Sequence, residues 1–313
     1  MKKQVRFGLG VLGILMLVSC TRSTAYRDDQ DYYRRDGGSA TSRASKFGQP
    51  KKKIFFYSFH NDTPFLADGL GDFMVSELKR EVRTSGKGVV PDDLRPKETS
   101  KDFYSGDKIR LSPLIREAKR MGVAMVAVGK IKKIIYRRKG DEVGLFRKKL
   151  SVAAVDLEMR VFSVGDNKEL LFVEKSVDAE SSEVDFVEDE AEDPKSQRVE
   201  LIKMALRNGA HQFGTDINLM LDKISWEGRI AKIGGGKIYI NAGRASGILV
   251  GDILKVLTPG EDVYDPATNA YLGRSQGQVK GTLEVVDYVG PDGAVTVLQS
   301  GGNVFENDPV QLY

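Results

Sequence analysis

The stretch VDLEMRVFSVGDNKELLF, residues 155–172, carries the clearest structural pattern of the sequence. Every second residue from Val155 to Val161 is apolar, and charged residues stand between them. This alternation is typical of a strand with one buried and one polar face. We therefore predict a strand over about 149–164 and a second, antiparallel strand over about 169–177.

Two units of strand and helix precede these strands. The apolar run KIFFYSF, residues 53–59, predicts a strand. Thr63 and Pro64 then suit the cap and the first turn of a helix, whose apolar residues recur at three- and four-residue spacing. This unit continues into GKGVV, a short strand, and a polar loop over 91–108.

The second unit leads into the central strands. Ser112-Pro113 opens its helix, Gly122 is a natural stop, and VAMVAVGKI, residues 123–131, predicts a buried strand. Downstream, Asp193-Pro194 starts a long helix with an apolar stripe. The stripe consists of Val199, Ile202, Leu206, Ala210, Phe213, Ile217, Met220 and Ile224. The predicted fold is an α/β layered domain with a mixed sheet and packing helices.

The sequence pattern changes at Trp226: from there on, short runs typical of β-strands are separated by glycine-rich turns. Such spacing predicts a small, separate all-β domain that resembles a barrel. The glycines of Ile233-Gly234-Gly235-Gly236-Lys237 do not form a phosphate loop, because no helix follows and Ile238 stands where Ser or Thr is needed. We interpret them as a hairpin turn.

The amino-terminal end predicts a lipoprotein. Basic residues are followed by an apolar run over 7–19 that is too short to span a membrane, and Leu17-Val18-Ser19-Cys20 resembles the lipobox of bacterial lipoproteins. That resemblance implies a diacylglycerol and an N-acyl chain on Cys20, the only cysteine, although a plain signal peptide with a chance cysteine is the alternative. Thr21, where enteric lipoproteins of the inner membrane have Asp, favours the inner leaflet of the outer membrane, facing the periplasm.

The predicted organisation has four parts. They are the signal peptide 1–19, a lipidated disordered tether 20–52, the α/β domain 53–223 and the small β domain 224–313. Removal of the signal would take away three basic residues and lower the formal net charge from +4 to +1, which argues against nucleic-acid binding. With two histidines and no His/Cys cluster, we expect neither an enzyme nor a metal, a cofactor or a small-molecule substrate.

Two charged stretches are candidates for interaction. Residues 130–149 hold nine basic and two acidic residues and predict a hairpin, whereas residues 178–193 hold nine acidic and no basic ones and predict a solvated loop, with a calcium site as the alternative. The candidate surface consists of Lys132, Lys133, Arg137, Arg138, Lys139, Arg147, Lys148 and Lys149. It is either a solubilising hairpin or a contact with lipid, with a partner subunit or with the acidic loop. If it joins subunits, reversing Arg137, Arg138 and Lys139 to Glu is expected to abolish assembly.

Residues 53–224 resemble the curli secretion lipoprotein (CsgG-like) family. The resemblance is carried by FHNDTPFLADGLGDFMVSEL, EAKRMGVAMVAVGKI and VDLEMRVFSVGDNKELLF, in that order. In the curli channel two long hairpins build a transmembrane barrel from many subunits. The corresponding stretches here, 132–149 and 178–193, predict a short hairpin and a loop without apolar strands of about 9–11 residues. The resemblance thus implies a periplasmic scaffold without a channel.

Residues 224–313 are similar to the carboxy-terminal domain of the flagellar assembly protein T (FlgT) family. GGKIYINAGRASGILVGDILKV carries most of the similarity and GTLEVVDYVGPDGAVTVL supports it. The two resemblances imply a structural part of an envelope machine, first of all a ring at the flagellar basal body, as a homo-oligomer or with other subunits. The alternative is an accessory for secretion or surface-fibre assembly, or a channel of the curli-secretion type.

Overall fold

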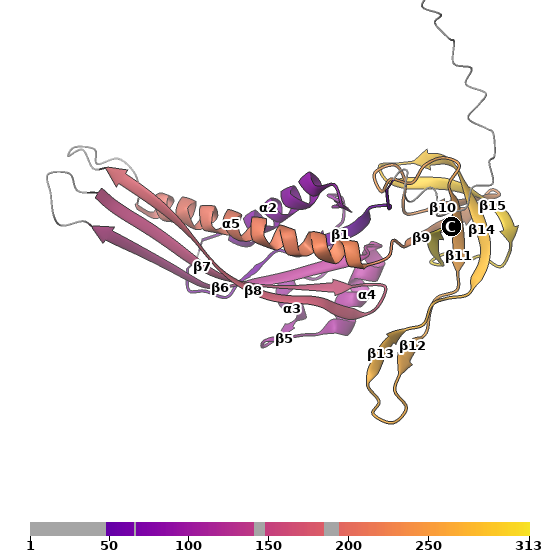
Figure 1. The fold of residues 1–313 in the computed structure, drawn as a ribbon, viewed down its shortest axis with the longest axis horizontal. Coiled ribbons are helices and arrows are strands. Elements are labelled where there is room, and N and C mark those ends of the chain that lie inside the picture. Colours follow the sequence, from indigo (N-terminus) through magenta and orange to yellow (C-terminus); the bar gives the residue numbers. More distant parts are fainter. Residues whose placement is uncertain (1–47, 66, 141–147, 185–193) are drawn as a thin grey trace, which may run out of the picture.

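The computed structural model of the chain describes residues 48–65, 67–140, 148–184 and 194–313. It has two parts, a mixed α/β sheet with helices and a separate closed β-barrel, as Figure 1 shows. The predicted order of a layered α/β part followed by a small barrel is confirmed at this level. The predicted signal peptide and most of the predicted tether lie outside the described residues.

The sheet of the first part has the strand order β3-β1-β6-β7-β8. Strand β1 runs parallel to both of its neighbours, β3 and β6, whereas β7 runs antiparallel to β6 and to β8, as predicted for the pair of β7 and β8. The strands are β1 (Lys52–Phe56), β3 (Gly88–Val89), β6 (Met125–Gly140), β7 (Lys148–Ser163) and β8 (Lys168–Val184), with β2 (His60–Asn61) beside β6.

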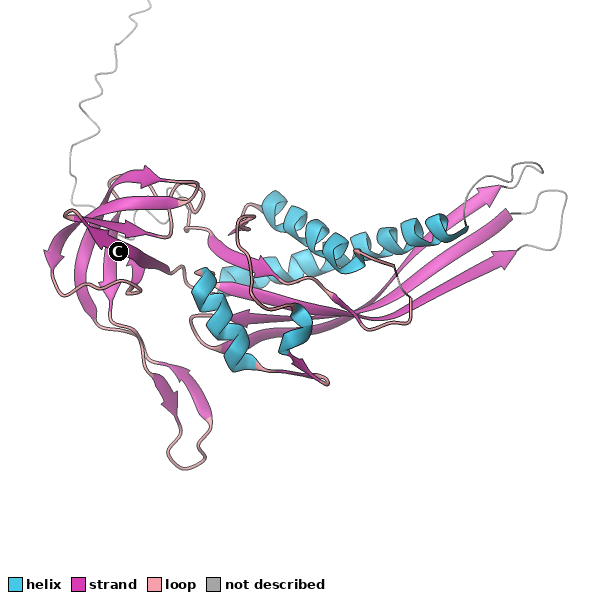
Figure 2. Ribbon diagram, turned by 180° about the vertical axis from the view of Figure 1, so that it is seen from behind, coloured by secondary structure: helices cyan, strands magenta, loops and turns pink. Residues whose placement is uncertain are grey.

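Helices cover the two faces of this sheet. The helices are α2 (Leu70–Ser85), α3 (Ser100–Phe103), α4 (Leu111–Met121) and α5 (Pro194–Lys223). Helices α2 and α5 pack together on one face, where their apolar side chains share a core with Leu157 and Met159. Helix α4 covers the other face, and its core includes Phe55 and Phe162. Figure 2 shows this layering from behind.

Helix α2 begins later than predicted. The hydroxyl of Thr63 donates to Asn61 Oδ1 at 2.8 Å and accepts from the backbone N–H of Phe65 at 3.2 Å. Thr63 is thus part of a turn after β2, and Gly69, with a φ of 77°, precedes the first helical residue instead. The cap predicted at Thr63 is therefore wrong, because a local side-chain turn competes for the same hydroxyl.

The segment predicted as a polar loop contains regular structure. Residues 100–109 form α3 and a small hairpin, β4 (Tyr104–Ser105) and β5 (Lys108–Ile109). The carboxylate of Asp102 accepts hydrogen bonds from both the N–H and the hydroxyl of Thr99, which caps this short helix. The fully buried ring of Phe103 fixes it to the core below α4.

The second part is a closed six-stranded barrel in the order β10-β15-β14-β11-β16-β9. Its strands are β9 (Gly228–Gly234), β10 (Lys237–Ile240), β11 (Ile253–Leu257), β14 (Val279–Val289), β15 (Gly293–Gly301) and β16 (Pro309–Leu312). The predicted hairpin turn is confirmed, since Gly235 and Gly236 connect β9 to β10 with φ angles of 62° and 72°. A ribbon of β12 (Asp262–Tyr264) and β13 (Tyr271–Arg274) projects from the barrel (Figure 1).

Direct contacts join the two parts, and we call four of the residues involved, Lys51, Lys53, Ser246 and Asp292, the joint. The backbone N–H of Lys51 donates to the carbonyl of Ser246 at 2.8 Å. The ammonium of Lys53 lies 3.0 Å from Asp292 Oδ2. The other carboxylate oxygen, Oδ1, accepts the N–H groups of Gly243 and Ser246, each at 2.8 Å. One partly buried carboxylate thus shapes a barrel loop and holds the sheet beside it.

Candidate assembly surface

Three strands of the sheet continue far beyond the body of the first part. We call their outer portion the arm, which consists of residues 132–140 of β6, 148–156 of β7 and 176–184 of β8. Figures 1 and 2 show it projecting away from the barrel, with the first half of α5 beside it. The prediction of a short hairpin is wrong in its length, since β6 and β7 have 16 residues each.

The acidic stretch is also more regular than predicted. Residues 178–184 belong to strand β8, while residues 185–193 lie outside the described part of the chain. The strand continues here because Val177 and Ala179 pair with Val155 and Ala153 and are buried. The regular spacing of these small apolar residues was the available sequence signal, which the surrounding charge obscured.

Helix α5 covers the inner face of the arm. The buried side chains Ala153 and Ala179 belong to the same core as Leu201 of α5. Further out, the guanidinium of Arg198 lies 5.0 Å from the ring centre of Tyr136, whose hydroxyl is 3.1 Å from Ser151 Oγ. This face is therefore occupied within the chain.

The outer face of the arm carries opposite charges on its two sides. Lys133 and Arg137 of β6 are exposed, as are Asp178 and Glu180 of β8. Strand β7 separates them, since the register aligns Arg137 with Val152 and Val152 with Glu180. Because cross-strand partners share a face, the arm presents a basic side and an acidic side on one surface.

Both sides of the arm are open strand edges. Among the described residues, β6 beyond Ile131 pairs only with β7, and β8 is the last strand of the sheet. One carbonyl of β8 is already bound, because Asn208 Nδ2 of α5 donates to the carbonyl of Asp178 at 2.9 Å. An open edge is able to accept a strand from another chain.

The basic residues of the predicted interaction surface differ in their contacts. Lys132 lies at a bulge in β6 and its ammonium contacts Glu174 Oε1 at 2.7 Å, a hydrogen bond that raises the pKa of Lys132. Lys132 is therefore paired within the chain, and it is exposed, as are Lys133 and Arg137. The backbones of Arg138, Lys139, Lys148 and Lys149 lie in β6 and β7, and their side chains lie outside what the structure describes, as do Arg147 and Cys20 entirely.

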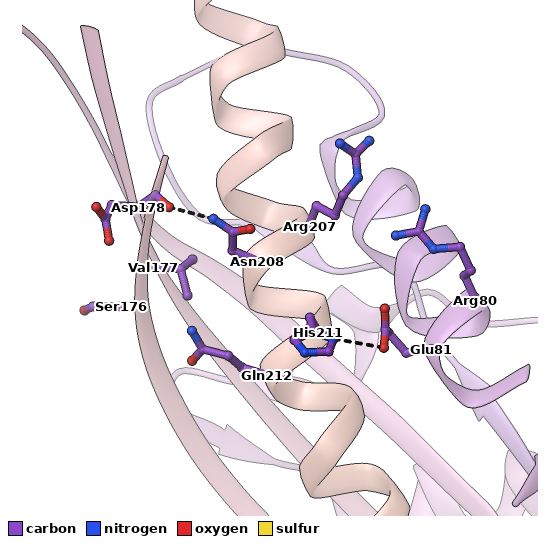
Figure 3. A pocket seen from close by; sticks show the side chains of 9 residues that line it. All are labelled: Arg80, Glu81, Ser176, Val177, Asp178, Arg207, Asn208, His211 and Gln212. Atoms are coloured by element: carbon purple, nitrogen blue, oxygen red, sulfur yellow. Dashed lines mark hydrogen bonds and ion pairs between the residues drawn. The ribbon is translucent and has the colours of Figure 1, made fainter. Parts of the chain in front are cut away.

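A pocket of about 490 Å³ at the base of the arm was not predicted. Figure 3 shows it around the exposed side of α5, with Arg207 and His211 directed toward α2 and Asn208 directed toward β8. His211 Nδ1 lies 3.2 Å from Glu81 Oε2, and the imidazole is exposed. The polar residues on this side of α5 were the only feature of the sequence that could have indicated the pocket.

Among the described residues, no three His, Cys, Asp or Glu side chains are grouped as a metal site requires. His60 lies far from His211 in the sequence, and its Nε2 atom is 3.9 Å from Asp62 Oδ1. None of the described helices is both long and apolar enough to cross a membrane.

Comparisons with known proteins do not assign a family. No family model matches the sequence, and no curated protein does. Among solved structures, a hypothetical protein from Chlamydia trachomatis is similar over 56% of this chain and 99% of its own, with 14% identity and a TM-score of 0.36. A minor lipoprotein from Acinetobacter baumannii is similar over 54% of this chain and 94% of its own, with 11% identity and a TM-score of 0.28. The PelC dodecamer from Paraburkholderia phytofirmans covers 51% of this chain and 87% of its own, with 14% identity and a TM-score of 0.26. These values are too low to establish a common fold or function.

Proposed function

We propose that this chain is a lipid-anchored, non-enzymatic structural subunit of the cell envelope that joins copies of itself through the arm. The single observation that supports assembly is the pair of open strand edges with opposite charge on one surface. The lipid anchor is inferred from the lipobox at Cys20. The anchor would hold the protein at the inner leaflet of the outer membrane, where it faces the periplasm.

The geometry favours head-to-tail contact between copies. The basic edge of β6 in one copy suits the acidic edge of β8 in the next, whereas two identical edges repel each other. Strands β6 and β8 both run antiparallel to β7, so the two edges of neighbouring copies would pair in parallel. Head-to-tail contacts of this kind form a closed ring when the rotation between copies closes.

Charge exchange at the arm tests the proposal. Replacing Lys133 and Arg137 with Glu gives a chain with two acidic edges, and replacing Asp178 and Glu180 with Lys gives one with two basic edges. Each variant alone is expected to lose self-association by at least about tenfold, because every contact then joins like charges. An equimolar mixture is expected to recover it. Sedimentation velocity of the full chain in detergent measures the oligomers.

The matched control reverses two exposed lysines of the barrel, Lys232 and Lys237, to Glu. This control carries the same change of charge away from the arm, and its oligomers are expected to equal those of the unmodified chain. Unchanged oligomers in both arm variants, or a monomeric unmodified chain, would reject assembly through the arm.

Two envelope machines fit such a subunit. We propose a ring associated with the flagellar basal body first, on the resemblance of residues 224–313 to the flagellar assembly protein T family. An accessory of secretion or surface-fibre assembly is the second candidate, on the resemblance of residues 53–224 to the curli secretion lipoproteins. Either role would depend on the anchored, self-associating subunit proposed here.

A further inference from the structure

A second cleft, of about 460 Å³, lies between the two parts of the molecule. Its walls come from the turn between β7 and β8, from the segment after α5, and from loops at one end of the barrel. Polar and charged groups line much of it, among them Asp166, Glu227, Arg229 and Arg274. The cleft is thus large enough for a small molecule and exists only where both parts meet.

Two arginines face this cleft. Arg229 and Arg274 line it and are half-buried. Their positive charges also act on Lys119 of α4, which does not line the cleft: burial and the two arginines lower the pKa of its ammonium, and the carboxylates of Asp262 and Glu227 raise it. Like charges held together in a partly desolvated place repel one another unless an anion lies among them.

Among the described residues, the nearby carboxylates form no close ion pair with Arg229 or Arg274. Glu227 Oε1 is 3.9 Å from the guanidinium of Arg229, which is too far for a hydrogen bond. Burial raises the pKa of Glu227, and the positive charges of Arg229, Arg274 and Lys119 oppose this shift. Asp166 Oδ2 accepts the hydroxyl of Ser163 at 2.8 Å, and Asp262 Oδ1 accepts the amide of Asn167 at 3.1 Å.

The two guanidinium groups retain donors for a ligand. Arg274 uses its Nε to bind the carbonyl of Gly260 at 2.7 Å, which orients the side chain. Within the described residues, Arg229 has no ionic contact shorter than the one to Glu227. A guanidinium offers a planar fork of N–H donors that matches the oxygens of phosphate and carboxylate groups.

We infer that the cleft between the two parts binds a ligand with a phosphate group, held by Arg229 and Arg274. A phosphate group fits better than a carboxylate, because it has more oxygens to accept hydrogen bonds from both guanidinium groups at once. The inference is independent of assembly through the arm. The ligand would lie where the first part of the chain meets the second, since the turn between β7 and β8 lines the same cleft as the two arginines.

Calorimetric titration of the full chain with inorganic phosphate tests this inference. The unmodified chain is expected to bind, and Arg229→Gln or Arg274→Gln is expected to weaken binding by about tenfold or more, the effect of losing a charge-assisted hydrogen bond. Arg229→Lys retains the charge without the fork and is expected to bind with intermediate affinity. Arg116→Gln is the matched control, since Arg116 lies on the exposed side of the same helix as Lys119.

Two further arms of the experiment identify the source of the phosphate. Soluble glycerol phosphate and vesicles of phosphatidylglycerol are titrated in the same way. Binding of the vesicles alone, with the same loss in Arg229→Gln, identifies a lipid headgroup, whereas binding of the soluble probes identifies a free phosphate ligand. The absence of binding to all three probes, or equal losses in Arg229→Gln and Arg116→Gln, overturns the inference. The circular dichroism spectrum of each variant controls for folding.

Discussion

Glu117 shows how one side chain ties a loop to a helix. Its Oε1 atom accepts the backbone N–H of Lys97 at 2.8 Å, and both of its oxygens accept donors from Arg120 at 2.6 and 2.9 Å. The hydrogen bonds from Arg120 are the main reason that the pKa of this buried carboxyl falls from 4.5 to about 2. The loop after β3 is therefore held to α4 by a carboxylate that stays ionised.

Replacing Glu117 with Gln is expected to lower the free energy of unfolding at neutral pH by about 2 kcal/mol, the size of a hydrogen bond to a charged group. Because the folded pKa is the lower one, this stabilisation is complete above pH 4.5 and is lost as the pH falls toward 2. Urea unfolding at pH 7 and pH 2.5 measures the difference between the two chains. Asp93→Asn, a change at an exposed carboxylate, is the control, and a difference that persists undiminished at pH 2.5 would contradict the prediction.

Single residues were predictable where the backbone conformation depends on them alone. Gly122 ends α4 with a φ of 67°, as its sequence position indicates, because glycine adopts this left-handed conformation without strain. Thr63 was not predictable in this way, because it has two competing hydrogen-bonding roles and the turn with Asn61 prevails. The two arginines of the cleft carry no local signal, because Arg229 of β9 and Arg274 of β13 come to line the same cleft only through the fold.

At the scale of elements, the first turn of α2 lies directly against the chain that follows β1. A Cβ atom at Gly71 would overlap the backbone carbonyl oxygen of Phe59. That oxygen belongs to the main chain and cannot rotate away as a flexible side chain would.

Gly71→Ala is therefore expected to cost about 1–3 kcal/mol, which lowers the melting temperature by several degrees. Thermal unfolding followed by circular dichroism measures this shift. Gly165→Ala is the matched control, since no atom lies within 4 Å of the added methyl group there. Equal melting temperatures of the two variants would show that the helix moves away freely.

The elements themselves were predictable where one pattern dominates. The long apolar stripe of α5 and the alternation in β7 each indicated the right structure. The end of β8 was missed, because its exposed residues are acidic and its buried ones are small. Likewise, α3 and the hairpin of β4 and β5 depend on the burial of Phe103. This tertiary contact cannot be predicted from the polar sequence around it.

At the scale of the whole molecule, the proposed flagellar role predicts a ring density that electron cryotomography detects. Deleting the gene is expected to remove a ring density around the basal body in electron cryotomograms and to weaken swimming. A complemented strain with the reversed arm variant, Lys133→Glu with Arg137→Glu, is expected to lack the same density, whereas Lys232→Glu with Lys237→Glu restores it. Intact motors and normal swimming in the deletion strain would reject the flagellar proposal and favour secretion or fibre assembly.

The joint would determine how this chain responds to a force applied through its amino-terminal end. The chain passes the barrel at Lys51 before it enters β1, the strand that lies between two parallel neighbours. Tension applied from that end first loads the contacts of Lys51 and Lys53 with the barrel. It then acts along β1, where the hydrogen bonds to both neighbours run across the direction of pull and share the force. Such a shear geometry resists mechanical unfolding better than an unzipping geometry, in which the hydrogen bonds break one at a time.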